Sequence, residues 1–134
     1  MTEMIEKPGR ESSQRPPERM DGPFLEYELL AQIELLRRED AYQHGRNSKT
    51  LAKYPDFCIV LTVMKGGTRI QQHTAAGRIS VHTVGGHIRM HVGAKLLDLP
   101  AGRLLVLDRS IPHDVEAVEE SAFLLTLASL EGRI

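Results

Sequence analysis

Two histidines, His73 and His113, are the residues of this chain whose type and surroundings point most directly to chemistry. Each closes a short stretch that begins with a glycine, Gly67 in the first case and Gly102 in the second. Neutral imidazole is a good ligand for zinc, iron, nickel and copper, and a metal site with a defined geometry needs at least three ligating groups. We therefore consider His73 and His113 as candidate metal ligands, with His82, the nearest further histidine, as a candidate third.

Short strands must position these histidines, because the hydrophobic pattern takes on a β-strand period from about residue 48 onward. The stretch 57–64 is a continuous apolar run, which predicts a strand buried on both faces. Gly85 and Gly86 separate two candidate strands and are typical of a hairpin turn. Eight or nine short strands predict a β-barrel or jelly roll, with strands expected at 50–53, 57–64, 69–73, 78–84, 87–92, 95–97, 104–107, 113–118 and 122–128.

The residues before the strands divide into a tail and a helix. Residues 1–22 are rich in proline and charge, which offer little to bury, and we expect a mobile tail there. Asp21 and Pro23 form a helix-start signal, and apolar residues then recur at helical spacing from Phe24 to about Glu39. The predicted organisation is a tail at 1–22, a helix and linker at 23–47, and a barrel at 48–134.

The spacing of glycines and histidines resembles the two motifs of the cupin superfamily. Gly67, His73 and Gly86 fall in register with the first motif, and Gly102 and His113 fall in register with the second. The runs 77–81 and 112–117 are similar to those of small bacterial single-domain cupins of the cupin 2 conserved-barrel type. The resemblance implies an all-β fold, namely a cupin-type jelly-roll β-barrel with one N-terminal helix, and a homodimer that pairs through its sheets.

The chain departs from those motifs at the remaining ligand positions. Ala75 stands where the first motif has its second histidine, and Ile79 or Ser80 stands where it has a glutamate. The resemblance therefore implies that His73 and His113 are the two ligands that remain, side by side at one end of the barrel interior. Two partly buried, hydrogen-bonded histidines without a metal are the alternative interpretation.

Three further residues are candidates for the same site. If position 79 faces inward, strand alternation turns His82 away from the barrel unless a bulge reverses it, so His82 is either a third ligand or an outward or interface histidine. Gln71 precedes His73 by two residues and should share its face, as a pocket residue or a surface strand residue. Arg78 adjoins the missing glutamate and is a second pocket candidate, with a barrel-rim residue as its alternative.

Two functions of different classes fit these residues. The first is binding of a small molecule in the barrel cavity, either without a metal or with a divalent metal (Zn, Fe, Ni or Mn) at the incomplete histidine site. The alternative is a metal-dependent enzyme, dioxygenase-like or isomerase-like, that uses His73 and His113. A purely structural or partner-binding barrel is a third hypothesis, and it would tolerate the loss of both histidines.

Composition restricts the partners and the compartment. The 134 residues include 17 basic and 18 acidic ones, a formal net charge of −1, so no global field would attract nucleic acid. The chain has no run of 18 apolar residues, and its first 23 residues lack the apolar segment of a signal peptide, so we expect no membrane partner and a cytoplasmic location. Cys58 lies in an apolar run and should be a buried small hydrophobe.

Overall fold

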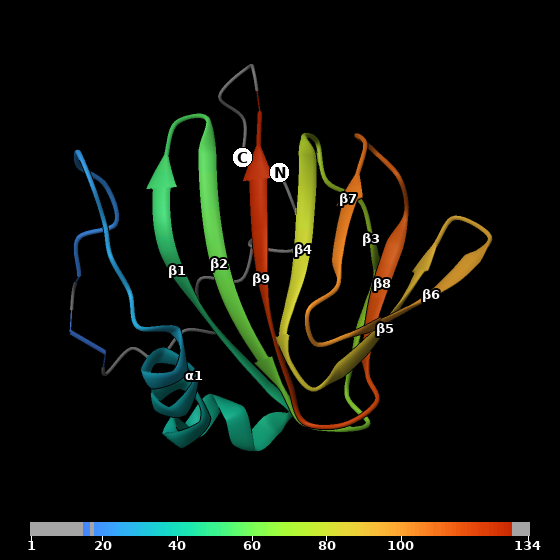
Figure 1. The fold of residues 1–134 in the computed structure, drawn as a ribbon, viewed down its shortest axis with the longest axis horizontal. Coiled ribbons are helices and arrows are strands. Elements are labelled where there is room, and N and C mark those ends of the chain that lie inside the picture. The colour runs from blue at the N-terminus through green and yellow to red at the C-terminus, as the bar shows by residue number, and fades with distance from the viewer. Residues whose placement is uncertain (1–14, 17, 130–134) are drawn as a thin grey trace.

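The computed structural model describes residues 15–16 and 18–129, which form two antiparallel sheets packed face to face with an α-helix at one side (Figure 1). The five-stranded sheet has the order β1-β2-β9-β4-β7, and the four-stranded sheet has the order β3-β8-β5-β6. This architecture confirms the all-β jelly-roll prediction. The elements are α1 (Leu29–Arg38), the 3₁₀ helix η2 (Asp40–His44), β1 (Arg46–Tyr54), β2 (Phe57–Met64), β3 (Arg69–His73), β4 (Arg78–Gly85), β5 (His87–Val92), β6 (Lys95–Pro100), β7 (Leu104–Leu107), β8 (His113–Ala117) and β9 (Ser121–Ala128).

Helix α1 begins later than the sequence predicts. Its N-cap is Glu28, whose Oε1 accepts a hydrogen bond from the Ala31 N–H at 3.0 Å. An acidic side chain satisfies the free amide groups of a first turn well. Residues 24–28 are not helical, and Tyr27 instead donates its hydroxyl to the Leu51 carbonyl at 2.6 Å. The helix prediction is confirmed from Leu29 onward and wrong for 24–28, because Glu28 caps the helix and Asp21 does not.

The N-terminal residues that the structure describes lie along β1, which is an edge strand of its sheet. The Lys53 N–H donates to the Met20 carbonyl at 2.7 Å, and the Tyr54 hydroxyl donates to the Gly22 carbonyl at 2.7 Å. Most of the predicted mobile tail, residues 1–14 and 17, lies outside the described residues.

Strand β1 is longer than the predicted segment 50–53. Its polar residues Asn47 and Lys49 are buried. The Asn47 side-chain amide donates to the Leu36 carbonyl at 2.9 Å and to the Glu39 carboxylate at 2.8 Å, at the end of α1. Buried polar residues obscure the alternation of apolar and polar residues by which a strand is recognised, which explains the underestimate. By contrast, β2, β3, β5 and β7 have the predicted bounds.

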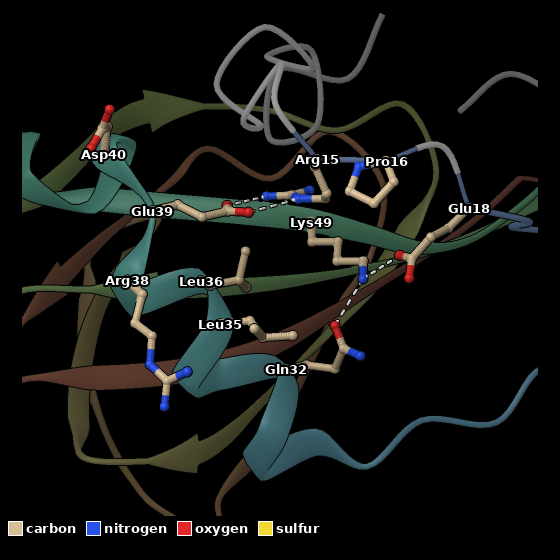
Figure 2. A pocket seen from close by; sticks show the side chains of 10 residues that line it. All are labelled: Arg15, Pro16, Glu18, Gln32, Leu35, Leu36, Arg38, Glu39, Asp40 and Lys49. Atoms are coloured by element: carbon tan, nitrogen blue, oxygen red, sulfur yellow. Dashed lines mark hydrogen bonds and ion pairs between the residues drawn. The ribbon is translucent and has the colours of Figure 1, made fainter.

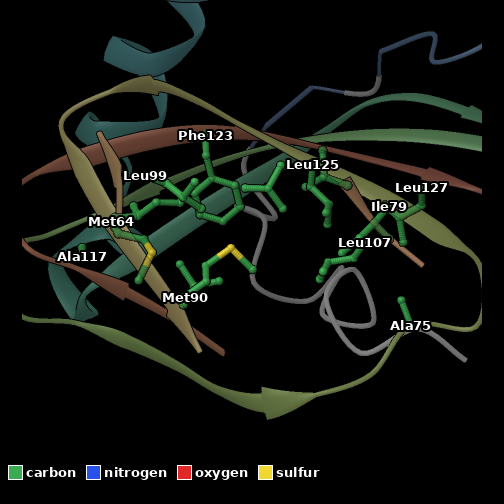
Figure 3. Packing of buried hydrophobic residues seen from close by; sticks show 14 of the residues in the cluster. Met64, Ala75, Ile79, Met90, Leu99, Leu107, Ala117, Phe123, Leu125 and Leu127 are labelled. Atoms are coloured by element: carbon green, nitrogen blue, oxygen red, sulfur yellow. The ribbon is translucent and has the colours of Figure 1, made fainter. Parts of the chain in front are cut away.

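Two hydrophobic clusters stabilise the fold. The larger lies between the sheets and contains Met64, Met90 and Phe123 among its fully buried side chains (Figure 3). The smaller lies on the outer face of the five-stranded sheet, where Ile33 and Leu36 of α1 pack against β1 and β2. Burial of this apolar surface is the main stabilising term. Cys58 is fully buried in the larger cluster, which confirms its prediction as a core residue.

Candidate functional site

Strands β3 and β8 place His73 beside His113. The two residues are cross-strand partners, and their ring centroids lie 4.4 Å apart with the ring planes inclined at 65°. A β-bulge separates Ile70 from His73, so both of these residues approach the barrel interior while Gln71, between them, is exposed. The structure therefore brings together the two histidines that the sequence singles out.

Backbone carbonyl groups fix the tautomer of both rings. The Nδ1 atom of His73 lies 2.6 Å from the Gln71 carbonyl oxygen, and that of His113 lies 2.8 Å from the Ile111 carbonyl oxygen. A carbonyl oxygen can only accept, so each Nδ1 must carry the proton and donate it. Each Nε2 is then left with its lone pair, which is the arrangement found in metal-ligating histidines.

The Nε2 atom of His73 is buried and makes no hydrogen bond to any residue that the structure describes. The Nε2 atom of His113 is buried as well. A buried polar nitrogen without a donor is unfavourable by about 1–3 kcal/mol. Binding of a metal ion at this atom would remove that penalty, and imidazole nitrogen suits zinc, iron and nickel. The histidine pair therefore supplies two nitrogen donors of the kind that a divalent metal uses.

Apolar side chains stand at the two missing ligand positions. Ala75 and Ile79, which occupy the two missing ligand positions, are buried and lie with Leu107 at one end of the core (Figure 3). Within residues 15–16 and 18–129, no group of three or more His, Cys, Asp or Glu side chains could hold a metal. A metal bound by the two histidines would keep its remaining coordination positions for solvent or for a ligand.

The other candidate residues point away from the pair. His82 is exposed on the outer face of β4, where it pairs with Leu104 on β7 and Leu124 on β9. No bulge reverses the parity of β4 between Ile79 and His82, so alternation holds there. Gln71 does not share the face of His73, contrary to the sequence expectation, because the bulge in β3 separates them. Its backbone carbonyl oxygen, rather than its side chain, contacts the site.

Arg78 also lies outside the barrel. It is exposed, and its Nε donates to the Asp108 carboxylate at 3.0 Å. The Arg109 backbone N–H and the positive charge of Arg78 hold the pKa of Asp108 below its usual value. This ion pair belongs to the barrel rim, which was the alternative interpretation of Arg78.

Asp114 follows His113 but faces the opposite side of β8. Its side chain accepts from the His91 backbone N–H at 2.8 Å and from Arg69 at 2.5 Å, and it contacts the His91 ring at 3.0 Å. Burial raises the pKa of Asp114, but these hydrogen bonds outweigh burial and keep it below its usual value. The tautomer of His113 is therefore set by the Ile111 carbonyl group and not by the neighbouring carboxylate.

A separate cavity of about 470 Å³ lies between α1, β1 and the residues Arg15, Pro16 and Glu18 (Figure 2). The sequence did not predict it, although the polar residues Asn47 and Lys49 within β1 are a signal of something buried there. Its charged groups form ion pairs with one another. Arg15 donates to the Glu39 carboxylate at 2.6 Å, and Lys49 pairs with Glu18. Burial raises the pKa of Glu39, but hydrogen bonds from Arg15 and Asn47 lower it further than burial raises it. This cavity is lined by a structural ion-pair network.

The described helices are all too short or too polar to cross a membrane.

The comparison with known proteins finds solved structures with a similar fold. No protein-family model and no curated protein matches the chain. A conserved protein of unknown function from Streptococcus pyogenes is 26% identical, with a TM-score of 0.63, over 66% of this chain and 78% of that one. A cupin 2 conserved barrel domain protein from Leptotrichia buccalis is 26% identical, with a TM-score of 0.64, over 72% of this chain but only 45% of its own.

An RmlC-like cupin protein from Desulfovibrio desulfuricans is 25% identical, with a TM-score of 0.59, over 64% of this chain and 84% of that one. These neighbours share the two-sheet barrel that the strand order of this chain describes. Because barrel, motif spacing and neighbours agree, the chain is a small cupin-type domain.

Proposed function

We propose that the chain binds a small oxygen-bearing molecule at the histidine end of its barrel, with a divalent metal (Zn, Fe, Ni or Mn) held by His73 and His113. The observation that carries the proposal is the Nε2 atom of His73, buried and without a hydrogen-bond partner among the described residues, on a ring 4.4 Å from that of His113. The Nδ1 hydrogen bonds of both rings support it, because they place the proton of each ring on Nδ1, as in metal-ligating histidines.

The chain's own residues would divide the work at such a site. His73 and His113 hold the metal, and the backbone carbonyl groups of Gln71 and Ile111 orient the two rings. Ala75 and Ile79 are apolar and buried, so at these two motif positions a ligand oxygen would not compete with a protein carboxylate. A bound divalent metal would act there as a Lewis acid that attracts and polarises an oxygen atom of the ligand.

A metal-dependent enzyme would use the same two histidines, and the two functions differ in whether the bound molecule is turned over. The orientation of His73 and His113 supports binding of a metal and a ligand. No described side chain has been given the role of a general acid or base. Binding is therefore the function that the site supports best, and turnover is an outcome to be measured on the metal-loaded protein.

The test is the metal content of the untagged protein and its affinity for added zinc, nickel, iron(II) and manganese. Substitution of His73 or His113 by alanine should abolish binding at this site. His82→Ala is the matched control. His82 is exposed on the outer face of β4, so its substitution should leave metal binding unchanged. A folded, metal-free protein that takes up none of the four metals, or one whose uptake survives the loss of His73, would overturn the proposal.

A further inference from the structure

The cavity between α1 and β1 has a buried lysine in its wall (Figure 2). Lys49 donates from its ammonium group to Gln32 Oε1 at 2.8 Å and pairs with the Glu18 carboxylate. A buried ammonium group needs such partners, because an unpaired charge away from water is strongly unfavourable. The cavity therefore contains a position built for a carboxylate, and Glu18 occupies that position.

Glu18 is the more exposed partner of this ion pair. Its side chain is 46% exposed, whereas that of Lys49 is 8% exposed, so water competes for the carboxylate far more than for the ammonium group. Glu18 also comes from the N-terminal segment 18–22, which lies along the edge strand β1. When Glu18 turns into solvent, the charge of Lys49 stays buried and needs another anion.

The other cations of the cavity have partners of a different kind. Arg15 pairs with Glu39, and the two side chains are 11% and 21% exposed, so both partners of that pair are largely buried. Arg38 pairs with Glu34 at 3.9 Å, and both side chains are exposed. Lys49 alone among these cations combines its own burial with a half-exposed carboxylate partner. The cavity therefore has one position where a carboxylate from solution can replace one from the chain.

The size and the apolar wall of the cavity limit the rest of the ligand. A volume of about 470 Å³ lies within the range of small-molecule pockets. Leu35 and Leu36 of α1 line the cavity, and Leu35 is 49% exposed. An aliphatic group placed against Leu35 would remove apolar surface from water, which favours binding. One carboxylate joined to a short aliphatic body fits these walls.

We propose that this cavity binds a small aliphatic monocarboxylate, whose carboxylate replaces that of Glu18 at the Lys49 ammonium group. Gln32 orients the ammonium group in both states, and Glu18 neutralises it when the ligand is absent. The site is distinct from the histidine pair, which lies on β3 and β8 of the other sheet. This inference does not depend on the metal.

An NMR titration with isovalerate, a small branched monocarboxylate, tests the proposal. Glu18→Ala removes the internal competitor and should tighten isovalerate binding by at least about ten-fold, because the native chain binds only in the fraction with Glu18 displaced. Glu26→Ala is the matched control: Glu26 is exposed before α1, and its loss should leave the affinity at the native value. Isovaleramide, the neutral analogue of the same shape, should not bind.

The site of binding is checked on the same samples. Isovalerate should shift the backbone amide resonances of Gln32, Leu35 and Lys49 and leave those of His73 and His113 unchanged. Adding Lys49→Met to Glu18→Ala should abolish binding, with circular dichroism confirming the fold. The comparison of Glu18→Ala with the native chain decides even where the double variant does not fold. Isovalerate binding to Glu18→Ala no more tightly than to the native chain, equal binding of isovaleramide, or shifts at the histidine pair instead would overturn the proposal.

Discussion

His73 and His113 each donate Nδ1–H to the backbone carbonyl group two residues earlier in the chain, at 2.6 and 2.8 Å. Two neighbouring strands thus fix the same tautomer in two cross-strand rings whose centroids are 4.4 Å apart. The acceptors are backbone atoms, so this orientation does not depend on the side chains of Gln71 and Ile111. The orientation of both rings is therefore set before a shared ligand binds, although the other two motif positions hold Ala75 and Ile79.

A third ligand should strengthen metal binding. Ala75 follows His73 by two residues and is buried, whereas its neighbour Ala76 is exposed. In Ala75→His the new imidazole should complete a three-histidine set and tighten zinc binding by about ten-fold or more, since three protein ligands are typical of zinc sites with an open position. Isothermal titration calorimetry measures the change. Ala76→His serves as the control, and equal affinities in the two variants would place the metal elsewhere.

Gly86 should be intolerant of a side chain, and the adjacent Gly85 should not. Gly86 has φ +75°, and a Cβ there would lie 2.2 Å from the Glu120 carbonyl oxygen, whereas a Cβ at Gly85 would meet no atom within 4 Å. We expect Gly86→Ala to lower the free energy of unfolding by roughly 2–4 kcal/mol. Gly85→Ala should change it by less than about 1 kcal/mol. Urea denaturation compares them, and similar losses in both variants would show that the turn is not the constraint.

Tyr42 should make the fold sensitive to alkaline pH. Its hydroxyl donates to Glu120 at 2.8 Å, and burial together with this hydrogen bond raises its pKa to about 12. A phenol whose folded-state pKa exceeds the unfolded value of about 10 stabilises the fold below that pH, and this stability is lost as pH rises from about 10 toward 12. Burial also raises the pKa of Tyr27, so Tyr42 accounts for part of the loss.

Tyr42→Phe should therefore flatten the dependence of unfolding free energy on pH above about 10. At neutral pH the same variant should be less stable by about 1 kcal/mol, because it loses one hydrogen bond. Urea denaturation at a series of pH values measures both effects. An unchanged alkaline slope in the variant would show that Tyr42 is not the group responsible.

Local patterns of apolar and polar residues predict much of this fold. Where the prediction was wrong, contacts between distant segments are the cause. The apolar run of β2 and the face of His82 were predictable because burial and alternation act within one strand. Strand β1 was underestimated because Asn47 and Lys49 are buried by partners on α1 and by Glu18, which no local pattern contains. The exposure of Gln71 depends on a bulge that forms only when β3 pairs with β8.

The central claim is that His73 and His113 together hold a divalent metal through Nε2. Long-range ¹H–¹⁵N NMR of the six histidine side chains during a zinc titration tests this claim most directly. We predict that zinc shifts the Nε2 resonances of His73 and His113 together, while their Nδ1 atoms remain protonated. Shifts confined to the exposed histidines His44, His82 and His91, or no shift at the pair with zinc in excess, would contradict it.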